Sequence, residues 1–216
     1  MIRHIHSDEP IALAMTGASG IQYGLRLLEC LLESSRPVYF MISKAARAVF
    51  ALESDVRLPG RTRDAEAYLT EKYRARSGQL RIFGAEEWTA PVASGSSAPG
   101  AMVVCPCSMS TLSAIAVGAS NQLITRAADV VLKERRLLIV VPRETPLSVI
   151  HLRNMVTLAE LGAVVMPANP AFYHHPNSIA DVIDFIVARI LDHLGVPHTL
   201  TQRWGIEEFN ENDTQE

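Results

Sequence analysis

Glycine and hydroxyl residues directly follow the first apolar run of the chain. The stretch LAMTGASGIQYG places Thr16, Gly17, Ser19 and Gly20 between that run and a leucine-rich helical pattern, which predicts a strand, a tight turn and a helix. Such a turn directs the free N–H groups of a helix N-terminus toward an anion such as a phosphate. The glycine spacing matches neither the dinucleotide-binding fingerprint nor the phosphate loop. The turn therefore indicates a nucleotide-like ligand without specifying which one.

A second group of hydroxyl residues lies in CPCSMST, residues 105–111. Ser108, Ser110 and Thr111 fall where a helix is expected to begin, so their hydroxyl and N–H groups could hold an anion or the polar edge of a ring. An ordinary serine N-cap explains the same pattern. We favour ligand contact, because this position repeats the arrangement of the first turn.

VPRETP, residues 141–146, places Arg143 and Glu144 between two prolines at the end of an apolar strand. Arg143 would supply a fixed cation and Glu144 a proton carrier. A surface ion pair is the alternative interpretation, since charged groups in a cleft mark functional sites only as a statistical tendency.

Other charged and aromatic residues also allow two interpretations. The KERR segment that begins with Lys133 is, on composition alone, a solvated helix end. Tyr173 precedes two histidines in a proline-rich loop, and a histidine pair with no third ligand is weak support for a metal site. Arg189 interrupts an apolar helical pattern and is either a surface residue or an anion clamp.

Continuous apolar runs alternate with helical patterns along the chain, which is typical of a parallel sheet with helices on both faces. The sequence therefore predicts an α/β fold with a doubly wound parallel sheet. Ligands of such sheets bind beyond the carboxyl ends of the strands, so the residues that follow the strands should share one rim, from the 16–20 turn to Tyr173. The Gly, Ser and Pro-rich segment 93–100 is expected to be a loop that permits close backbone approach to a ligand. The expected strands are 11–15, 38–43, 79–84, 101–106, 137–142 and 163–167. One helix is expected directly after Gly20, and further helices are expected at 44–53, in part of 57–76, and at 108–118, 123–134, 147–161 and 178–194.

Composition narrows the class of protein. The 216 residues are 48% hydrophobic and carry a net charge of −3, which favours a single domain and gives no reason to expect nucleic acid as a partner. We expect flexible segments at about 1–9 and 205–216. The lack of a long apolar run and of a signal-peptide pattern predicts no membrane span and a cytoplasmic location. Cys30, Cys105 and Cys107 are expected to be packing residues rather than nucleophiles or metal ligands.

Together these segments resemble the UbiX-type flavin prenyltransferases, flavoproteins related to FMN-dependent cysteine decarboxylases. The resemblance covers about residues 10–204 and is carried most specifically by LKERR, VPRETP and PAFYH, with MTGASG, ISKAAR, ASGSSAPG, CPCSMSTLSAIAVG, HLRNM and the helix of Arg189 as further matches. It implies a flavodoxin-like or Rossmann-like three-layer α/β/α domain that assembles as a dodecamer, with active sites between subunits.

The resemblance also implies an enzyme that joins the dimethylallyl group of dimethylallyl monophosphate to N5 and C6 of reduced FMN and releases phosphate, without a metal. The prenylated FMN would serve UbiD-type decarboxylases, as in ubiquinone biosynthesis. Ser19, Lys133 and Glu144 are the expected catalytic residues, with Glu144 handling the proton of ring closure and Ser19 as a relay. Lys133, Tyr173 and Arg189 would bind the prenyl phosphate. The implied FMN contacts are Gly17, Ala18, Ser19, Ser43, Ser108, Met109, Ser110, Thr111 and Arg143.

Two other functions compete with prenyl transfer. An FMN-dependent decarboxylase of a cysteine-containing substrate would share the fold and the FMN site. Such enzymes are expected to use a histidine in the flavin-binding region, and no histidine lies between His6 and His151. A non-catalytic FMN carrier would leave four residues without a purpose, namely Lys133, Glu144, Tyr173 and Arg189. Both comparisons favour prenyl transfer.

Overall fold

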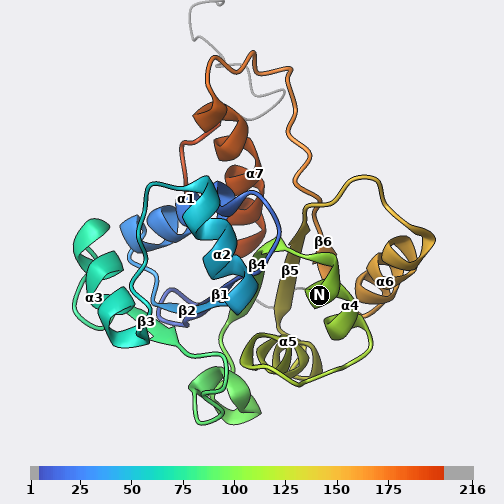
Figure 1. The fold of residues 1–216 in the computed structure, drawn as a ribbon, viewed down its shortest axis with the longest axis horizontal. Helices are drawn as coiled ribbons and strands as arrows, with labels where there is room; N and C mark the ends of the chain where they lie inside the picture. The colour runs from blue at the N-terminus through green and yellow to red at the C-terminus, as the bar shows by residue number, and fades with distance from the viewer. Residues whose placement is uncertain (1–4, 202–216) are drawn as a thin grey trace, which may run out of the picture.

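A parallel β-sheet forms the centre of the molecule (Figure 1). The computed structural model describes residues 5–201. Within that range the sheet has six strands in the order β3-β2-β1-β4-β5-β6, and each neighbouring pair is parallel. The chain moves outward in one direction from β1 and in the other from β4, so the strand order reverses between these two central strands. The strands are β1 Ile11–Met15, β2 Val38–Ile42, β3 Leu80–Phe83, β4 Ala101–Cys107, β5 Leu137–Pro142 and β6 Val164–Val165.

Helices cover both faces of the sheet and complete a three-layer α/β/α sandwich. Buried side chains of α1, α2, α3 and α7 pack in one hydrophobic cluster, and those of α4, α5 and α6 pack in a second cluster on the opposite face. This arrangement confirms the predicted doubly wound fold. The helices are α1 Ile21–Glu33, α2 Lys44–Glu53, α3 Thr62–Lys72, α4 Met109–Ala116, α5 Leu123–Lys133, α6 Val149–Glu160 and α7 Ile179–Leu194.

Strand β1 shows why its sequence is apolar without alternation. Ile11, Leu13 and Met15 point into the first cluster, whereas Ala12 and Ala14 point into the second. Successive side chains of a strand point to opposite faces, and both faces of this sheet are covered by helices. Each residue of the strand is therefore buried, and an alternating polar pattern would place polar groups in the core.

The structure differs from the sequence prediction at two segments. The strand expected at 163–167 is reduced to Val164–Val165 at the edge of the sheet, where the backbone N–H of Met166 still reaches Val140. Pro167 then follows, and proline has no N–H to donate to a strand ladder. The loop expected at 93–100 contains a short turn of 3₁₀ helix at Gly95–Ser97, and another such turn, Pro91–Ala93, ends where the loop begins.

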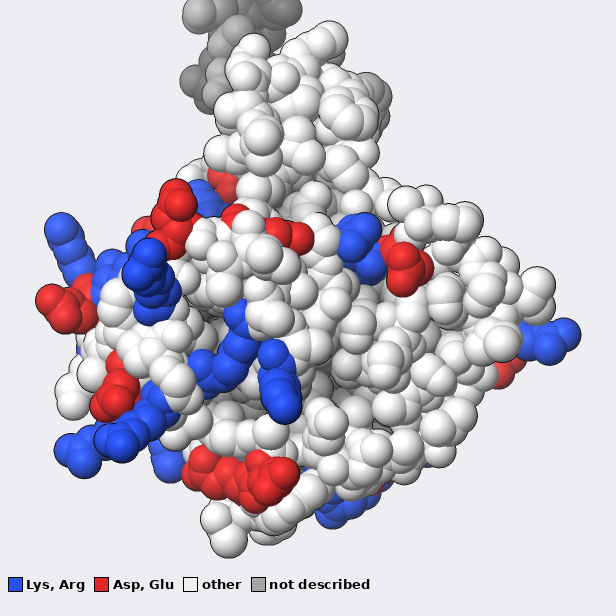
Figure 2. Space-filling model, in the orientation of Figure 1, with Lys and Arg blue, Asp and Glu red and all other residues white. Residues whose placement is uncertain are grey.

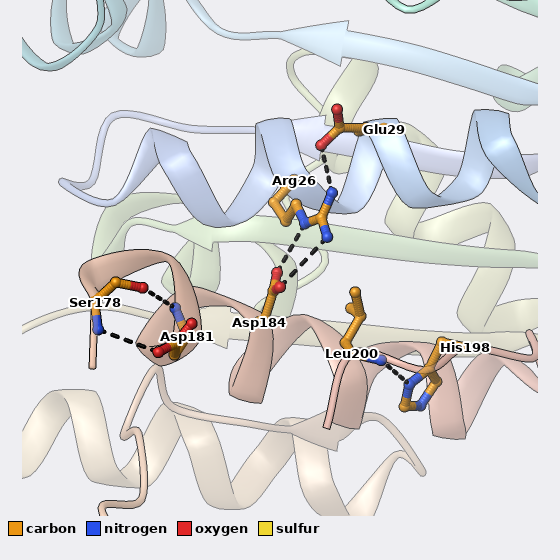
Figure 3. A network of polar contacts seen from close by, with 7 residues as sticks. All are labelled: Arg26, Glu29, Ser178, Asp181, Asp184, His198 and Leu200. Carbon is orange, nitrogen blue, oxygen red and sulfur yellow. Dashed lines mark hydrogen bonds and ion pairs between the residues drawn. The ribbon is translucent and has the colours of Figure 1, made fainter. Parts of the chain in front are cut away.

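Helix α7 packs beside α1, and the segment that leads into it extends beyond the rest of the molecule (Figure 1). Arg26 of α1 joins the two helices, with its Nε 2.7 Å from Asp184 Oδ1, and its Nη1 lies 2.6 Å from Glu29 Oε2 (Figure 3). Polar groups thus fix the position of α7 along α1, beyond what the apolar contacts between the helices specify.

Two residues of the N-terminal segment that was expected to be flexible make contacts with the rest of the chain. Ile5 is buried in the first cluster, and the carboxylate of Glu9 lies 2.9 Å from Arg136 Nη1. The tail expected at 205–216 lies outside the described residues. Among the helices of residues 5–201, none combines the length and the hydropathy that a membrane crossing requires.

Candidate active site

The loops that follow β1 and β4 are joined by one buried hydroxyl group. Thr16 Oγ1 donates a hydrogen bond to the Pro106 carbonyl at 2.9 Å and accepts one from the Ser108 backbone nitrogen at 2.7 Å. The backbone nitrogen of Thr16 also donates to the Pro106 carbonyl. These bonds hold the two turns together at the point where the strand order reverses, which is where ligands of doubly wound sheets bind.

Serine side chains cap α2 and α4, two of the helices that begin at this edge. Ser108 Oγ accepts a hydrogen bond from the Thr111 backbone nitrogen at 3.3 Å and donates to Thr111 Oγ1 at 3.1 Å. Ser43 Oγ accepts from the Ala46 backbone nitrogen at 3.0 Å in the same way. The ordinary N-cap that the sequence allowed is therefore present at Ser108. It leaves the N-termini of α2 and α4 at the rim, where their positive ends favour an anion.

The loop after β5 closes the rim on its other side. Arg143 Nε donates to the Ser19 carbonyl at 3.3 Å, and the Arg143 backbone nitrogen donates to the Cys107 carbonyl at 3.3 Å. A cavity of about 240 Å³ opens beside Arg143 and Glu144, and residues 167–169 form part of its wall. The expected rim is thus confirmed from the 16–20 turn to residue 169.

A residue absent from the sequence prediction, Glu53, lies at the N-terminus of α1. Its Oε2 accepts hydrogen bonds from the backbone nitrogens of Gly20 at 2.8 Å and Ile21 at 3.3 Å. The anion at this helix terminus is therefore a carboxylate of the chain itself. Glu53 is the last residue of α2 and is more than 30 residues from Gly20 in the sequence, so no local pattern signals the contact.

The surroundings of Glu53 set its charge. Partial burial acts to raise the pKa of Glu53, but a hydrogen bond from the Ser19 side chain and those from the backbone of Gly20 and Ile21, with the nearby Arg143 charge, lower the pKa below its ordinary value. The carboxylate is therefore ionised at neutral pH. The Ser19 side chain and the Arg143 charge thus both act to keep the Glu53 carboxylate ionised.

The glycines of the opening motif are required by the chain's own packing. A Cβ added at Gly17 would lie 2.5 Å from the Cβ of Ala45 in α2. Gly20 has φ of 102°, in the left-handed region that L side chains rarely adopt, and a Cβ there would lie 2.9 Å from Tyr23 Cδ2. These contacts explain both glycines before any ligand is considered.

Lys133 does not lie at the rim of its own chain. It ends α5 just before the amino end of β5, and a side chain at Gly95, just before β4, would meet its Nζ. The amino ends of parallel strands lie at the edge opposite their carboxyl ends, so Lys133 and the 93–100 loop are on the far edge of the sheet from Ser19. Lys133 Nζ lies 2.6 Å from Glu134 Oε1 and its side chain is half-exposed.

Tyr173 and Arg189 are also separate from the rim. The Tyr173 ring packs against α7, with its centroid 4.2 Å from that of His174 and 5.9 Å from that of Phe185. Arg189 is exposed on α7, and its Nη1 lies 2.6 Å from Asp192 Oδ2. The expectation that the rim extends to Tyr173 is wrong within one chain. The 170–178 segment, which precedes α7 in the sequence, leaves the sheet and runs alongside that helix (Figure 1).

The cysteines are packing residues, as predicted. Cys30, Cys105 and Cys107 are buried, and burial raises the pKa of Cys30 to about 11 and that of Cys107 to about 12. A thiol with a raised pKa is protonated and weakly nucleophilic at neutral pH.

Comparison with known proteins agrees with this fold. The Flavoprotein family model matches residues 3–191. The flavin prenyltransferase UbiX of Pseudomonas aeruginosa is 61% identical over 197 residues, which are 91% of this chain and 94% of that protein.

Two solved structures are also similar. A UbiX structure in complex with FMN and dimethylallyl pyrophosphate has a TM-score of 0.82 and 39% identity, covering 93% of this chain and 100% of the other. A dodecameric FMN-dependent UbiX-like decarboxylase from Escherichia coli has a TM-score of 0.79 and 38% identity, covering 90% of this chain and 98% of the other.

The doubly wound sheet, with serine-capped helices and an arginine at its switch point, defines a flavodoxin-like protein of the flavoprotein class. Within that class the chain belongs to the UbiX family of flavin prenyltransferases, and it is an enzyme of the prenyltransferase type.

Proposed function

We propose that this enzyme transfers the dimethylallyl group of dimethylallyl monophosphate to FMN and releases phosphate. Reduced FMN, when bound, supplies the electron-rich N5 and C6 atoms that accept the group. The similarity to a UbiX structure that holds FMN and dimethylallyl pyrophosphate supports these ligand classes. Within this chain, two hydrogen bonds at the switch point of the sheet carry the proposal. One joins Ser108 to Thr16, and the other joins Arg143 to Ser19.

The donor groups at the rim fit FMN. Helix N-termini favour phosphate, and those of α2 and α4 are exposed to the rim beside Ser43 and Ser108. Glu53 already occupies the N-terminus of α1, and two anions at one terminus would repel each other. We therefore assign the FMN phosphate to residues 108–111 and the N-terminus of α4. The remaining proposed FMN contacts are Gly17, Ala18, Ser19, Ser43 and Arg143.

Three side chains are proposed to bind the prenyl phosphate and to stabilise its departure. Negative charge grows on a leaving phosphate, and positioned cations that meet this charge lower the barrier. Lys133 and Arg189 supply the cations, and the Tyr173 hydroxyl supplies a hydrogen-bond donor. We propose that these groups act without a metal ion.

Proton transfer is assigned to Glu144 and Ser19. Glu144 lines the cavity beside Arg143, so it can supply the proton that the prenyl alkene takes up and accept the one that C6 gives up when the ring closes. The Ser19 hydroxyl, which is hydrogen-bonded to Glu53, can relay a proton between the rim and that carboxylate.

The separation of these residues in one chain implies a site shared between copies. Ser19 lies at the carboxyl edge of the sheet and Lys133 lies at the amino edge, so the two cannot contact one substrate within a chain. We therefore propose a closed homo-oligomer, and the dodecameric relative suggests a dodecamer.

Exposed apolar surfaces support this assembly. Val149, Ile150, Leu152 and Val156 of α6 are between 48% and 67% exposed, and Phe172 on the projecting segment is 67% exposed. Figure 2 shows charged side chains gathered over the α2 and α3 side, whereas the projecting segment carries none on this face. Apolar patches of this kind mark protein interfaces, and a second copy of the chain would cover them.

We further propose that residues 1–216 form one flavin-binding domain that works in the cytoplasm. Its product would be the cofactor of a UbiD-type decarboxylase. These assignments are based on family membership, and the use of the product depends on the proposed reaction.

Mass analysis of the flavin tests the proposed function. The protein is incubated anaerobically with reduced FMN and dimethylallyl monophosphate, and the flavin is then released. We expect a mass gain of one dimethylallyl group together with release of inorganic phosphate, and neither change without protein. A flavin of unchanged mass would contradict the proposal. In that case a cysteine-containing peptide tests the decarboxylase alternative, through carbon dioxide release.

A further inference from the structure

The chain reverses direction directly after α7. Gly195 adopts the left-handed conformation with φ of 65°, and its backbone nitrogen donates to the Asp192 carbonyl at 3.1 Å. Val196 is buried and donates to the Leu191 carbonyl. This glycine-terminated turn brings His198 back beside the last turn of the helix.

His198 is held from both sides of its ring. The Leu200 backbone nitrogen donates to His198 Nδ1 at 3.4 Å (Figure 3), and His198 Nε2 lies 3.2 Å from Asp192 Oδ1. Because Nδ1 accepts a hydrogen bond, the ring proton lies on Nε2 and is donated to the Asp192 carboxylate. The backbone thus fixes both the tautomer and the direction of the imidazole.

The second oxygen of Asp192 contacts the proposed phosphate ligand Arg189. Asp192 Oδ2 lies 2.6 Å from Arg189 Nη1. Exposure rises along this chain of contacts, because the side chains of His198, Asp192 and Arg189 are 8%, 26% and 53% exposed. One end is therefore anchored in the protein and the other end presents a cation at the surface.

We propose that Asp192 is a positioning residue for the Arg189 guanidinium, and that His198 orients Asp192. The inference rests on the proposed role of Arg189 in binding the prenyl phosphate. A guanidinium carries five N–H donors in a rigid fork. The bond from Nη1 to Asp192 restricts the rotamers of Arg189 and leaves the donors on Nε and Nη2 for a phosphate.

Asp192 could instead compete with the phosphate for Arg189, and its removal would then change phosphate binding in the opposite direction. A carboxylate that merely competes for Arg189 would weaken phosphate binding, so its removal would tighten binding. A positioning carboxylate would instead weaken binding when it is removed, because Arg189 would then sample several rotamers and lose entropy on capturing the ligand. The direction of the change therefore separates the two roles.

Equilibrium binding without turnover measures this direction. Protein loaded with oxidised FMN is titrated with dimethylallyl monophosphate in a calorimeter. The proteins compared are wild type, Asp192→Asn, Arg189→Ala and the variant that carries both changes. We expect Asp192→Asn to raise Kd about tenfold, as losses of positioning contacts do. In the Arg189→Ala background the same change should have no further effect, because the positioned group is gone. Unchanged or tighter binding by Asp192→Asn, or additive effects in the double variant, would overturn the proposal.

The histidine arm is tested by two replacements. His198→Gln retains an N–H donor toward Asp192 and should stay within about threefold of wild-type Kd, whereas His198→Leu should show the full loss of about tenfold. Equal Kd values for the two variants would contradict the orienting role. Steady-state assays should show a raised KM for dimethylallyl monophosphate and also a lowered kcat, because Arg189 is proposed both to bind the phosphate and to stabilise its departure.

A matched control removes the same kind of contact elsewhere. Glu29 pairs with Arg26 at 2.6 Å with the same spacing along a helix, and Glu29→Gln should leave Kd unchanged. Failure of the proposed function is recognised separately, because wild-type protein would then not prenylate reduced FMN, whatever its Kd for the monophosphate. A change in Kd for Glu29→Gln equal to that for Asp192→Asn would refute the specific role of Asp192.

Discussion

The carboxylate of Glu53 lies 2.8 Å from the backbone nitrogen of Gly20 and caps helix α1 from the end of helix α2. The same carboxylate accepts a hydrogen bond from the Ser19 side chain. One acidic residue therefore completes a helix terminus and contacts a proposed catalytic hydroxyl, which couples the stability of the opening turn to the chemistry of the rim.

Replacement of Glu53 by Gln should destabilise the fold at neutral pH by about 0.5 kcal/mol, because the charge at the helix N-terminus is lost. The lowered pKa of Glu53 fixes the pH dependence. Its stabilisation is present above the ordinary carboxyl pKa and is lost as pH falls through the lowered folded-state pKa. Urea unfolding of both proteins at neutral pH and in acid measures the difference, which should shrink in acid. A difference that grows in acid would contradict this role.

Gly17→Ala should destabilise the protein even without flavin, by about 1–2 kcal/mol, because the new methyl group meets the Cβ of Ala45. Removing that Cβ should relieve the collision. The double variant Gly17→Ala with Ala45→Gly should therefore lose less stability than the sum of the single variants. Thermal unfolding of flavin-free protein measures all three. Additive losses would mean that the glycine serves the ligand and not the packing against α2.

Lys133→Ala and Ser19→Ala should each reduce prenylation on the order of 10²-fold. If one site takes these residues from different copies, co-expression of the two variants should produce mixed oligomers with some intact sites. Activity should then rise well above that of either variant. Separately purified variants that are mixed without exchange of subunits provide the control. Mixed oligomers that remain inactive would contradict a shared site.

Ile150→Asp on α6 should break up the proposed oligomer, because Ile150 is 67% exposed in the single chain and a buried charge at an interface is costly. Leu52→Asp is the matched control, since Leu52 is 86% exposed on α2, away from this surface. Light scattering should show a smaller particle for Ile150→Asp alone. If both variants keep the wild-type mass, α6 does not form the interface.

Much of the fold could be predicted because the strands are continuous apolar runs. A strand such as β1, buried on both faces, must be apolar throughout, and turns rich in glycine and serine separate it from its helix. Edge positions were harder to predict. The strand expected at 163–167 was reduced to Val164–Val165, because its length depends on a partner strand and on Pro167 rather than on hydrophobicity.

The sequence by itself determined which residues follow the strands, and parallel strands bring such residues to one edge. Ser19, Ser108 and Arg143 could therefore be placed at a common rim in advance. Only the tertiary structure decided that Glu53 reaches Gly20, because that contact depends on how α2 packs beside the opening turn. It likewise decided that Lys133 lies at the opposite edge from Ser19. Spacing along a chain specifies local geometry, whereas contacts between distant segments are set by the packing of whole elements.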